Sequence, residues 1–311
     1  MFDITDQIFQ DAGKAREYLE GQRWPGGPVC PHCGSVDDAG KLRGASTRPG
    51  VYKCRGCKKP FTVTVDTVFE DSKVPLNTWL MATFLVCSSK KGMSALQISR
   101  MLGVTRKTAW FMCHRIREAM TPSESASSPI GGGNKVVESD ETYIGGKKKN
   151  VHVGKPEPKK HAVVTLVERD GEVRAKHVPN VTARNVKAHL AASVDKKSYL
   201  VTDESPIYVT PAKDYSGHAS VNHSKGEYVR LGGFAHVNTA ESFHALVKRQ
   251  MYGTHHAVSE WHLQRYINEI AFRWNHRIAL GIDDKERTNA ALKAIEGKRL
   301  MYRPTNEAAH A

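Results

Sequence analysis

The chain has 311 residues, 40% of them hydrophobic, which is enough for two or three domains with cores of ordinary size. Lysine and arginine number 46 against 32 acidic residues, and the net charge of +14 predicts a polyanionic partner. The longest apolar run, WLMATFLVC, is too short to cross a bilayer, and the acidic start MFDITDQIFQDAGK has no apolar core of a secretory leader. We therefore expect a cytoplasmic protein without a membrane partner.

The first predicted element is a helix over residues 5–21. Apolar residues recur there at helical spacing, Thr5 is a candidate cap, and Gly21 marks the end. We expect this helix to contribute packing and no chemistry.

Four of the six cysteines form two C-x-x-C pairs that are separated by twenty residues. Such pairs are typical of a tetrahedral zinc site, which stabilises a small fold with little core of its own. A redox-active disulfide needs only one pair, and no βαβ pattern surrounds these two. We therefore predict a zinc ribbon in which structural Zn²⁺ is bound by Cys30, Cys33, Cys54 and Cys57.

Residues 75–120 have the pattern of a helix-turn-helix preceded by one further helix. Gly103 permits the turn, and Thr105 caps the second helix, whose first turn would meet base edges and phosphates. Helical hairpins of this kind also occur in proteins that bind no DNA. The residues expected to contact DNA are Thr105, Arg106, Lys107, Thr108 and Arg115, the last on a basic face shared with His114 and Arg117.

Two acidic residues follow a linker that is rich in Ser, Pro and Gly at 121–133. Asp140 lies in KVVESDETYIGG, which predicts a strand that delivers this acid near its exit. Asp203 ends the short apolar strand YLVTD, and open α/β sheets place their chemistry at such strand ends. The two acids are therefore candidates for one site.

A third acid, Glu241, falls in the first turn of a predicted helix that Asn238 or Thr239 caps. Lys248 lies two turns further on the same helical face. Three carboxylates from two strands and a helix suit two Mg²⁺ ions, which need hard oxygen ligands. Acids in first helical turns are also common without a metal, so the spacing alone leaves both interpretations open.

The segment IGGKKKNVHVGKPEPKK is a poor candidate for packed structure. It is either a solvated loop or a contact to phosphates near the acids through Lys147, Lys148 and Lys149. A hairpin over HAVVTLVERDGEVRAKHVP and an amphipathic helix over TARNVKAHLAASV follow. The order of strand, hairpin, helix, strand and helix predicts an α/β domain with an RNase H-like core, a mixed sheet flanked by helices.

Taken together, these stretches resemble the zinc-ribbon transposases of bacterial insertion sequences, the ISXO-like group of the DDE superfamily. The similarity extends over nearly the whole chain. It rests on RWPGGPVCPHCGS, YKCRGCKKPFTVT, TVFEDSKVPL, KTAWFMCHRIREAM, SDETYIGGK, VTDES, VNHSKGEYVR, HVNTAESFHALVKR, YINEIAFRWNHR and ERTNAALKAIEGKRL.

The resemblance implies that Asp140, Asp203 and Glu241 are the metal ligands and that Lys248 contacts DNA near the reacting phosphate. It implies an enzyme that cleaves the ends of its own element and joins the freed 3′-OH to target DNA. Both steps would be in-line phosphoryl transfers on two Mg²⁺ ions, for which Mn²⁺ would substitute. Some relatives carry Asn or His in place of the third acid, and Asn238 and His244 lie close to Glu241, so they remain alternatives.

The resemblance also implies partners and a domain order. The partners would be double-stranded DNA and further copies of the chain, at least a dimer on DNA, in the nucleoid of a bacterium. The expected segments are an N-terminal helix at 1–22, a zinc ribbon at 23–74, a helix-turn-helix DNA-binding domain at 75–120, a linker at 121–133, an RNase H-like DDE catalytic domain at 134–280, and a C-terminal helix and tail at 281–311.

Two other classes of protein fit parts of these patterns. One is an inactive or domesticated transposase that acts as a sequence-specific DNA-binding protein through its ribbon and helix-turn-helix. Such a regulator has no need of three acids and Lys248, which favours the enzyme. The other is a host nuclease of RNase H type, which would act on any suitable duplex or hybrid.

Overall fold

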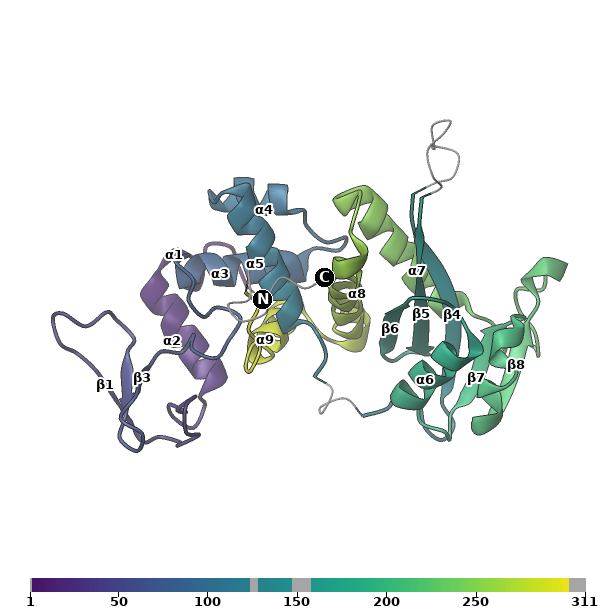
Figure 1. Cartoon of the computed structure of the whole chain (residues 1–311), viewed down its shortest axis with the longest axis horizontal. Helices are drawn as coiled ribbons and strands as arrows, with labels where there is room; N and C mark the ends of the chain where they lie inside the picture. Colours follow the sequence, from purple (N-terminus) through teal and green to yellow (C-terminus); the bar gives the residue numbers. More distant parts are fainter. Residues whose placement is uncertain (1, 124–127, 147–157, 302–311) are drawn as a thin grey trace, which may run out of the picture. The chain divides into compact units, whose positions relative to one another are not determined.

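The computed structural model describes residues 2–123, 128–146 and 158–301. Contacts divide the chain into two compact units, one formed by Met1–Met120 with Ile282–Ala311 and the other by Thr121–Gly281 (Figure 1). The end of the chain therefore belongs to the same unit as its start. No helix in the described ranges is long and apolar enough to span a membrane.

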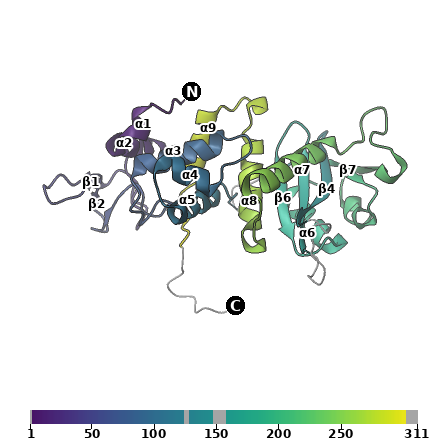
Figure 2. The same ribbon diagram turned by 90° about the horizontal axis from the view of Figure 1, so that it is seen from above.

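The first unit combines a small antiparallel sheet with a helical block. Asp11 divides the N-terminal helix that was predicted as continuous, because its backbone is extended while its side chain caps the second half. The last helix, α9 (Asp284–Lys293), packs against α3 (Leu76–Ser88) (Figure 2). Arg287 of α9 donates to the carbonyl of Cys87 at 3.1 Å. Its elements are α1 (Gln7–Gln10), α2 (Ala12–Arg23), β1 (Ala39–Lys41), β2 (Tyr52–Cys54), β3 (Pro60–Phe61), α3 (Leu76–Ser88), α4 (Ala95–Leu102), α5 (Arg106–Ala119) and α9 (Asp284–Lys293).

The second unit is built on a five-stranded mixed sheet. Its elements are β4 (Val136–Gly145), β5 (Lys160–Glu168), β6 (Val173–Val178), α6 (Ala183–Ser193), β7 (Tyr199–Asp203), β8 (Gly217–Val221), α7 (Asn238–Gln250) and α8 (Glu260–Asn275). The strand order is β6-β5-β4-β7-β8, in which β4, β5 and β6 pair antiparallel while β7 and β8 run parallel to β4. This order is that of the RNase H-like fold, so the predicted fold class is confirmed.

Helices cover both faces of this sheet (Figure 1). Ile144 and Val163 pack with α7 and α8 in one core, whereas Val137 and Leu200 pack with α6 in another. Because successive side chains of a strand point to opposite faces, even-numbered residues of β4 face α7 and odd-numbered residues face α6. This alternation decides which acidic side chains meet which helix.

Candidate active site

Acidic side chains gather where β4 and β7 lie next to each other. The parallel register pairs Ser139 with Thr202, so Asp140 and Asp203 follow side by side on the face covered by α7. One oxygen each of Asp140, Glu141 and Asp203 lies within 4.8 Å of the others. A donor set made only of carboxylate oxygens fits Mg²⁺ or Mn²⁺ rather than a softer metal.

Glu141 is a member of this cluster that the sequence patterns did not single out. Strand alternation predicts that Glu141 points to the opposite face of the sheet from its neighbour Asp140, and therefore away from the acidic cluster. Burial, followed by the charges of Asp203 and Asp140, raises the pKa of Glu141 to about 7. Its position directly after the first acid, near the end of the parallel pairing, is the signal in the sequence that could have found it.

The helix that carries Glu241 lies against the same face of the sheet. His244, one turn after Glu241, is buried, and its Nε2 lies 3.0 Å from Oγ1 of Thr165. Its Nδ1 lies 3.4 Å from Oδ2 of Asp140. Glu241 is exposed and does not belong to the group of three clustered acids, and Lys248 is exposed two turns further on. The metal-binding role of Glu241 therefore stays a prediction.

A buried carboxylate fixes the start of α7. Oε2 of Glu138 accepts hydrogen bonds from the backbone N–H groups of Thr239 and Ala240 at 2.8 and 3.0 Å. Oε1 accepts from the Thr239 hydroxyl at 3.0 Å and from Nε of Arg169 at 2.7 Å. The expectation that the helix caps itself is wrong, because Glu138 satisfies these amides from β4 and its charge complements the helix dipole. The strand β4 thus carries both Asp140 and Glu138, the residue that fixes the start of α7.

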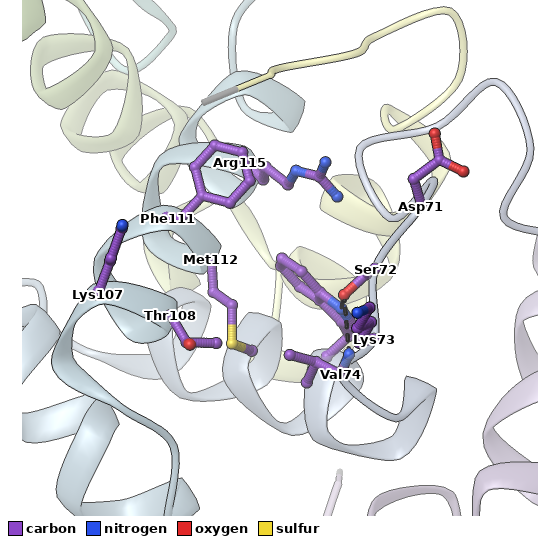
Figure 3. A pocket seen from close by; sticks show the side chains of 10 residues that line it. Asp71, Ser72, Lys73, Val74, Lys107, Thr108, Phe111, Met112 and Arg115 are labelled. Carbon is purple, nitrogen blue, oxygen red and sulfur yellow. Dashed lines mark hydrogen bonds between the residues drawn. The ribbon is translucent and has the colours of Figure 1, made fainter. Parts of the chain in front are cut away.

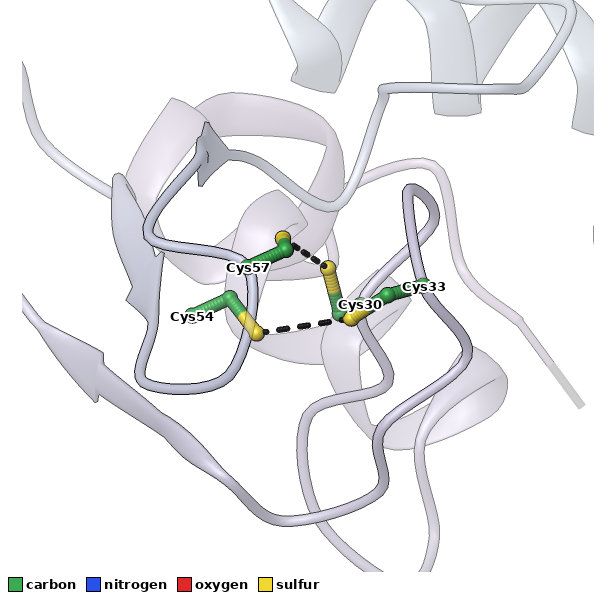
Figure 4. Close-up of side chains that lie close together, drawn as sticks. All are labelled: Cys30, Cys33, Cys54 and Cys57. Atoms are coloured by element: carbon green, nitrogen blue, oxygen red, sulfur yellow. Dashed lines mark hydrogen bonds between the residues drawn. The ribbon is translucent and has the colours of Figure 1, made fainter.

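The four cysteines predicted to bind zinc lie together in the first unit (Figure 4). The Sγ atoms of Cys30 and Cys57 are 3.7 Å apart, and those of Cys33 and Cys54 are 3.6 Å apart. Zinc–sulfur bonds of about 2.3 Å in a tetrahedron require sulfur atoms about 3.8 Å from each other. The cluster is therefore consistent with structural zinc.

The thiols of this cluster differ in acidity. Burial raises the pKa of Cys30 to about 11, whereas the hydroxyl of Ser35 lowers the pKa of Cys33 to about 6. Zinc binds thiolates, so a bound cation would hold the buried thiol in its deprotonated form.

The helix-turn-helix forms as predicted. Gly103 ends α4 with a positive φ of 65°, which glycine adopts without strain. Oγ1 of Thr105 accepts from the backbone N–H of Thr108 at 3.1 Å and so caps α5. Arg106 and Lys107 are exposed in the first turn. The first turn of α5 thus presents cations as a recognition helix requires, and their contact with DNA stays a prediction.

The prediction of an exposed basic face further along α5 is wrong. Arg115 is 7% exposed, and its guanidinium donates to the carbonyls of Glu70 at 2.8 Å and Leu300 at 3.1 Å. His114 and Arg117 are buried as well. Arg115 therefore ties α5 to two distant segments of its own unit.

A cavity of about 420 Å³ lies beside the first turns of α5 (Figure 3). Lys107 and Thr108 line it, and Trp79 contributes to its apolar wall while donating from Nε1 to Oγ of Ser72 at 2.9 Å. Two residues of the first turn that are predicted to contact DNA, Lys107 and Thr108, thus border a hollow. Lys147, Lys148 and Lys149 lie outside the described residues, so their contact with DNA also stays a prediction.

An RNase H-like sheet with acids on neighbouring strands, in a chain that also has a four-cysteine ribbon, is the architecture expected of a DDE-type transposase. Residues 131–275 match the family described as ISXO2-like transposase domain, and residues 11–60 match the transposase zinc-ribbon domain. Together the two matches cover more than half of the chain. The chain therefore contains an ISXO2-like transposase domain preceded by a transposase zinc ribbon, which confirms the resemblance.

Two further proteins are similar to this chain. The "Uncharacterized protein in transposable element ISH50" of Halobacterium salinarum is 27% identical over 286 residues, which cover 86% of this chain and 92% of the relative. That relative is archaeal, so the expected bacterial origin has no support. A solved "Mos1 transposase paired-end complex with left transposon end" is 15% identical, with 65% of this chain and 77% of that chain covered. The TM-score between the two structures is 0.23.

Proposed function

We propose that this protein is an active transposase that cleaves the ends of its own element and joins the freed 3′-OH to target DNA. The observation that carries the proposal is the group of acidic oxygens on β4 and β7 in a chain of this family. An inactive DNA-binding descendant would have no use for clustered carboxylates, whose mutual repulsion costs stability. The enzyme is therefore favoured over the regulator.

The residues proposed to hold divalent cations are Asp140 and Asp203, with Glu241 as the third acid. The cluster offers only hard oxygen ligands, which fits Mg²⁺, and Mn²⁺ is expected to substitute. When bound, two such cations would stabilise the attacking and leaving oxygens of an in-line displacement. His244, which lies between Thr165 and Asp140, would orient that carboxylate.

No protein nucleophile is needed for either step. In cleavage, water attacks the phosphodiester at the element end, and the 3′-oxygen leaves with a proton. In joining, that 3′-OH attacks a target phosphodiester and displaces another 3′-oxygen. The part of the protein is to position DNA, with Lys248 proposed to hold a phosphate near the reacting group.

DNA binding is proposed for the first unit. The chain carries a net charge of +14, and Arg106 and Lys107 lie exposed at the start of α5. Phosphate contacts by such cations release counterions and favour binding at low salt. Pairing the two ends of one element requires at least two copies of the chain, so we propose a dimer on DNA.

The test is strand cleavage on a labelled duplex that carries the ends of the element. Nicking at the end with Mg²⁺, absent with EDTA and absent in Asp203→Ala, is the expected result. Asp214→Ala removes an acid outside the cluster and should cut like the unchanged protein. Sequence-specific binding with no nicking would favour the inactive DNA-binding protein, and equal cutting of any duplex would favour a host nuclease.

A further inference from the structure

A second group of metal-ligating side chains lies in the catalytic unit, apart from the acidic cluster. Nδ1 of His161 is 3.6 Å from Oε1 of Glu260, and Nε2 of His177 is 4.0 Å from the same oxygen. One ligand atom of each residue lies within 4.8 Å of the other two. Two imidazoles and one carboxylate therefore converge on a single point.

The fold brings these three residues together by strand register and helix docking. Odd-numbered residues of β5 and β6 face α8, and both histidines belong to that set. Gln264 of α8 accepts from the backbone N–H of His177 at 2.7 Å and donates to the carbonyl of Ala175 at 3.1 Å. These two bonds hold α8 on the edge strand, so Glu260 in its first turn faces the histidines from a fixed helix.

One polar atom of this group of three residues lacks a hydrogen bond in the part of the chain that the structure describes. Nε2 of His177 is buried and makes no hydrogen bond within the described ranges. Lys159 donates to Oε2 of Glu260 at 2.7 Å, which leaves Oε1 directed toward both rings. An ion pair alone leaves this buried nitrogen 4.0 Å from Glu260, which is too far for a hydrogen bond.

We infer that His161, His177 and Glu260 form a site for a borderline divalent cation of the Zn²⁺ class. Bonds of about 2.0–2.2 Å to nitrogen and oxygen place tetrahedral ligand atoms about 3.4 Å apart. The two measured separations exceed that value by less than about 1 Å. His161 also lines a cavity of about 430 Å³, which leaves room for water as the fourth ligand.

The donor set separates this site from the two others. Imidazole nitrogen suits Zn²⁺, Ni²⁺ and Co²⁺, whereas an all-oxygen set suits Mg²⁺ and an all-thiolate set takes structural zinc. The site would bind its metal in the presence of excess Mg²⁺. Bound there, the cation would fasten the first turn of α8 to β5 and β6.

The test is a calorimetric titration of the full chain with Zn²⁺. The protein is first loaded with one equivalent of zinc for the cysteines and kept in millimolar Mg²⁺. We expect one further equivalent to bind to the unchanged protein. Loss of one ligand in His177→Ala or Glu260→Gln should weaken this binding at least about tenfold. His256→Ala removes an exposed histidine that lines the same cavity and should bind as before.

A spectroscopic arm identifies which side chains bind the added metal. Co²⁺ in the second equivalent should show no thiolate-to-metal charge-transfer absorption, because its ligands are nitrogen and oxygen. Unfolding curves without added metal should match for Glu260→Gln and the unchanged protein, so this variant carries the test if His177→Ala misfolds. Absence of a further equivalent, or an equivalent that survives in Glu260→Gln, would overturn the inference. Neither result depends on strand cleavage.

Discussion

Glu141 and Glu241 are the two candidates for the third acid of the proposed metal site. Glu141 lies close to Asp140 and Asp203, but strand alternation places it toward the α6 side of the sheet. Glu241 lies on the helix that covers the other two acids. The carboxylate on the helix is therefore the one that we expect to matter for catalysis.

The first prediction compares these two acids by isosteric substitution. Glu241→Gln should lower Mg²⁺-dependent strand cleavage at least about 100-fold, because even the loss of an outer-shell partner of a metal ligand typically costs about 10–100-fold in activity. Glu141→Gln should cost less than about tenfold. Initial rates of nicking, at equal occupancy of the DNA, check both values. A reversed order of the two variants would transfer the role to Glu141.

The second prediction concerns His189, which is buried in α6. Burial lowers the pKa of His189 to about 4 from an ordinary value of 6.5. Between pH 6.5 and pH 4 the imidazole of His189 is protonated in the unfolded chain but stays neutral in the folded chain. The free energy of unfolding therefore falls as the pH drops from 6.5 toward 4. This group should contribute a loss on the order of 3 kcal/mol over that window.

Urea unfolding of the unchanged protein and of His189→Gln, at neutral pH and near pH 4, isolates this contribution. Other groups act in both proteins, so the difference between the two pH slopes belongs to His189. Parallel slopes would show that the ring is not the source of the acid sensitivity.

At the scale of single elements, the seating of α7 depends on one buried side chain from β4. Glu138→Gln replaces a charge that accepts from two helix amides, a hydroxyl and Arg169. The third prediction is a loss of unfolding free energy of about 3 kcal/mol, since a buried charge network is broken from one side. Thermal or urea unfolding of the second unit measures it.

A matched substitution shows whether burial is the cause. Glu172→Gln breaks an exposed ion pair with Arg174 and should change stability by less than about 1 kcal/mol. Strand cleavage should also fall in Glu138→Gln, since the helix that carries Glu241 would lose its anchor. Unchanged stability in both variants would contradict the role given to Glu138.

The fourth prediction separates two kinds of cation on α5. Alanine at Arg106 or Lys107, both exposed in the first turn, should weaken DNA binding and reduce the slope of log affinity against log salt by about 1. Alanine at Arg115 should lower the melting temperature and leave the salt slope unchanged, because this guanidinium binds carbonyls of its own chain. A reduced slope in the Arg115 variant would instead return it to the DNA-binding surface.

Elements with local signals could be predicted from sequence. The β5–β6 hairpin, the α6 helix with its Thr182 cap and the α4–α5 turn at Gly103 each follow from residues within a few positions of one another. Glu138 meets the start of α7 about a hundred positions later in the chain, and Arg115 meets Leu300 at a still greater separation. Periodicity carries no information about such long-range contacts, so those side chains were assigned from their type alone.

The residues of the candidate site also differ in whether a local sequence signal predicts them. Strand ends predicted Asp140 and Asp203, and their closeness follows from parallel pairing, which the sequence order of strands implies. Strand alternation places Glu141 on the opposite face of the sheet from Asp140, so the sequence does not predict that Glu141 joins the acidic cluster. The rule fails here because β4 continues past the last residue that pairs with β7. The four cysteines were found because zinc imposes a fixed spacing on the chain itself.

At the scale of the whole molecule, the fifth prediction concerns loss of zinc. Cys54→Ser should abolish the zinc bound at the cysteines and loosen the ribbon, where Tyr52 and Phe61 stack at 5.7 Å. The second unit has its own cores, so it should keep its protection against hydrogen exchange. Zinc analysis and exchange rates of each unit check this, with Cys113→Ser, a buried thiol outside the cluster, as control. Exchange that rises in both units would show that they depend on one another for stability.

The return of α9 to the first unit makes the second unit an insertion within the first. During synthesis, α3 leaves the ribosome almost two hundred residues before the helix that packs on it, with Asn289 of α9 the partner of Tyr18. A frameshift or early stop just after Gly281 would therefore remove part of the unit that holds the ribbon and the helix-turn-helix. The second unit, with Asp140 and Asp203, would stay complete although it lies nearer to the mutation in the sequence. Such truncated copies should lose DNA recognition before they lose the folded catalytic sheet.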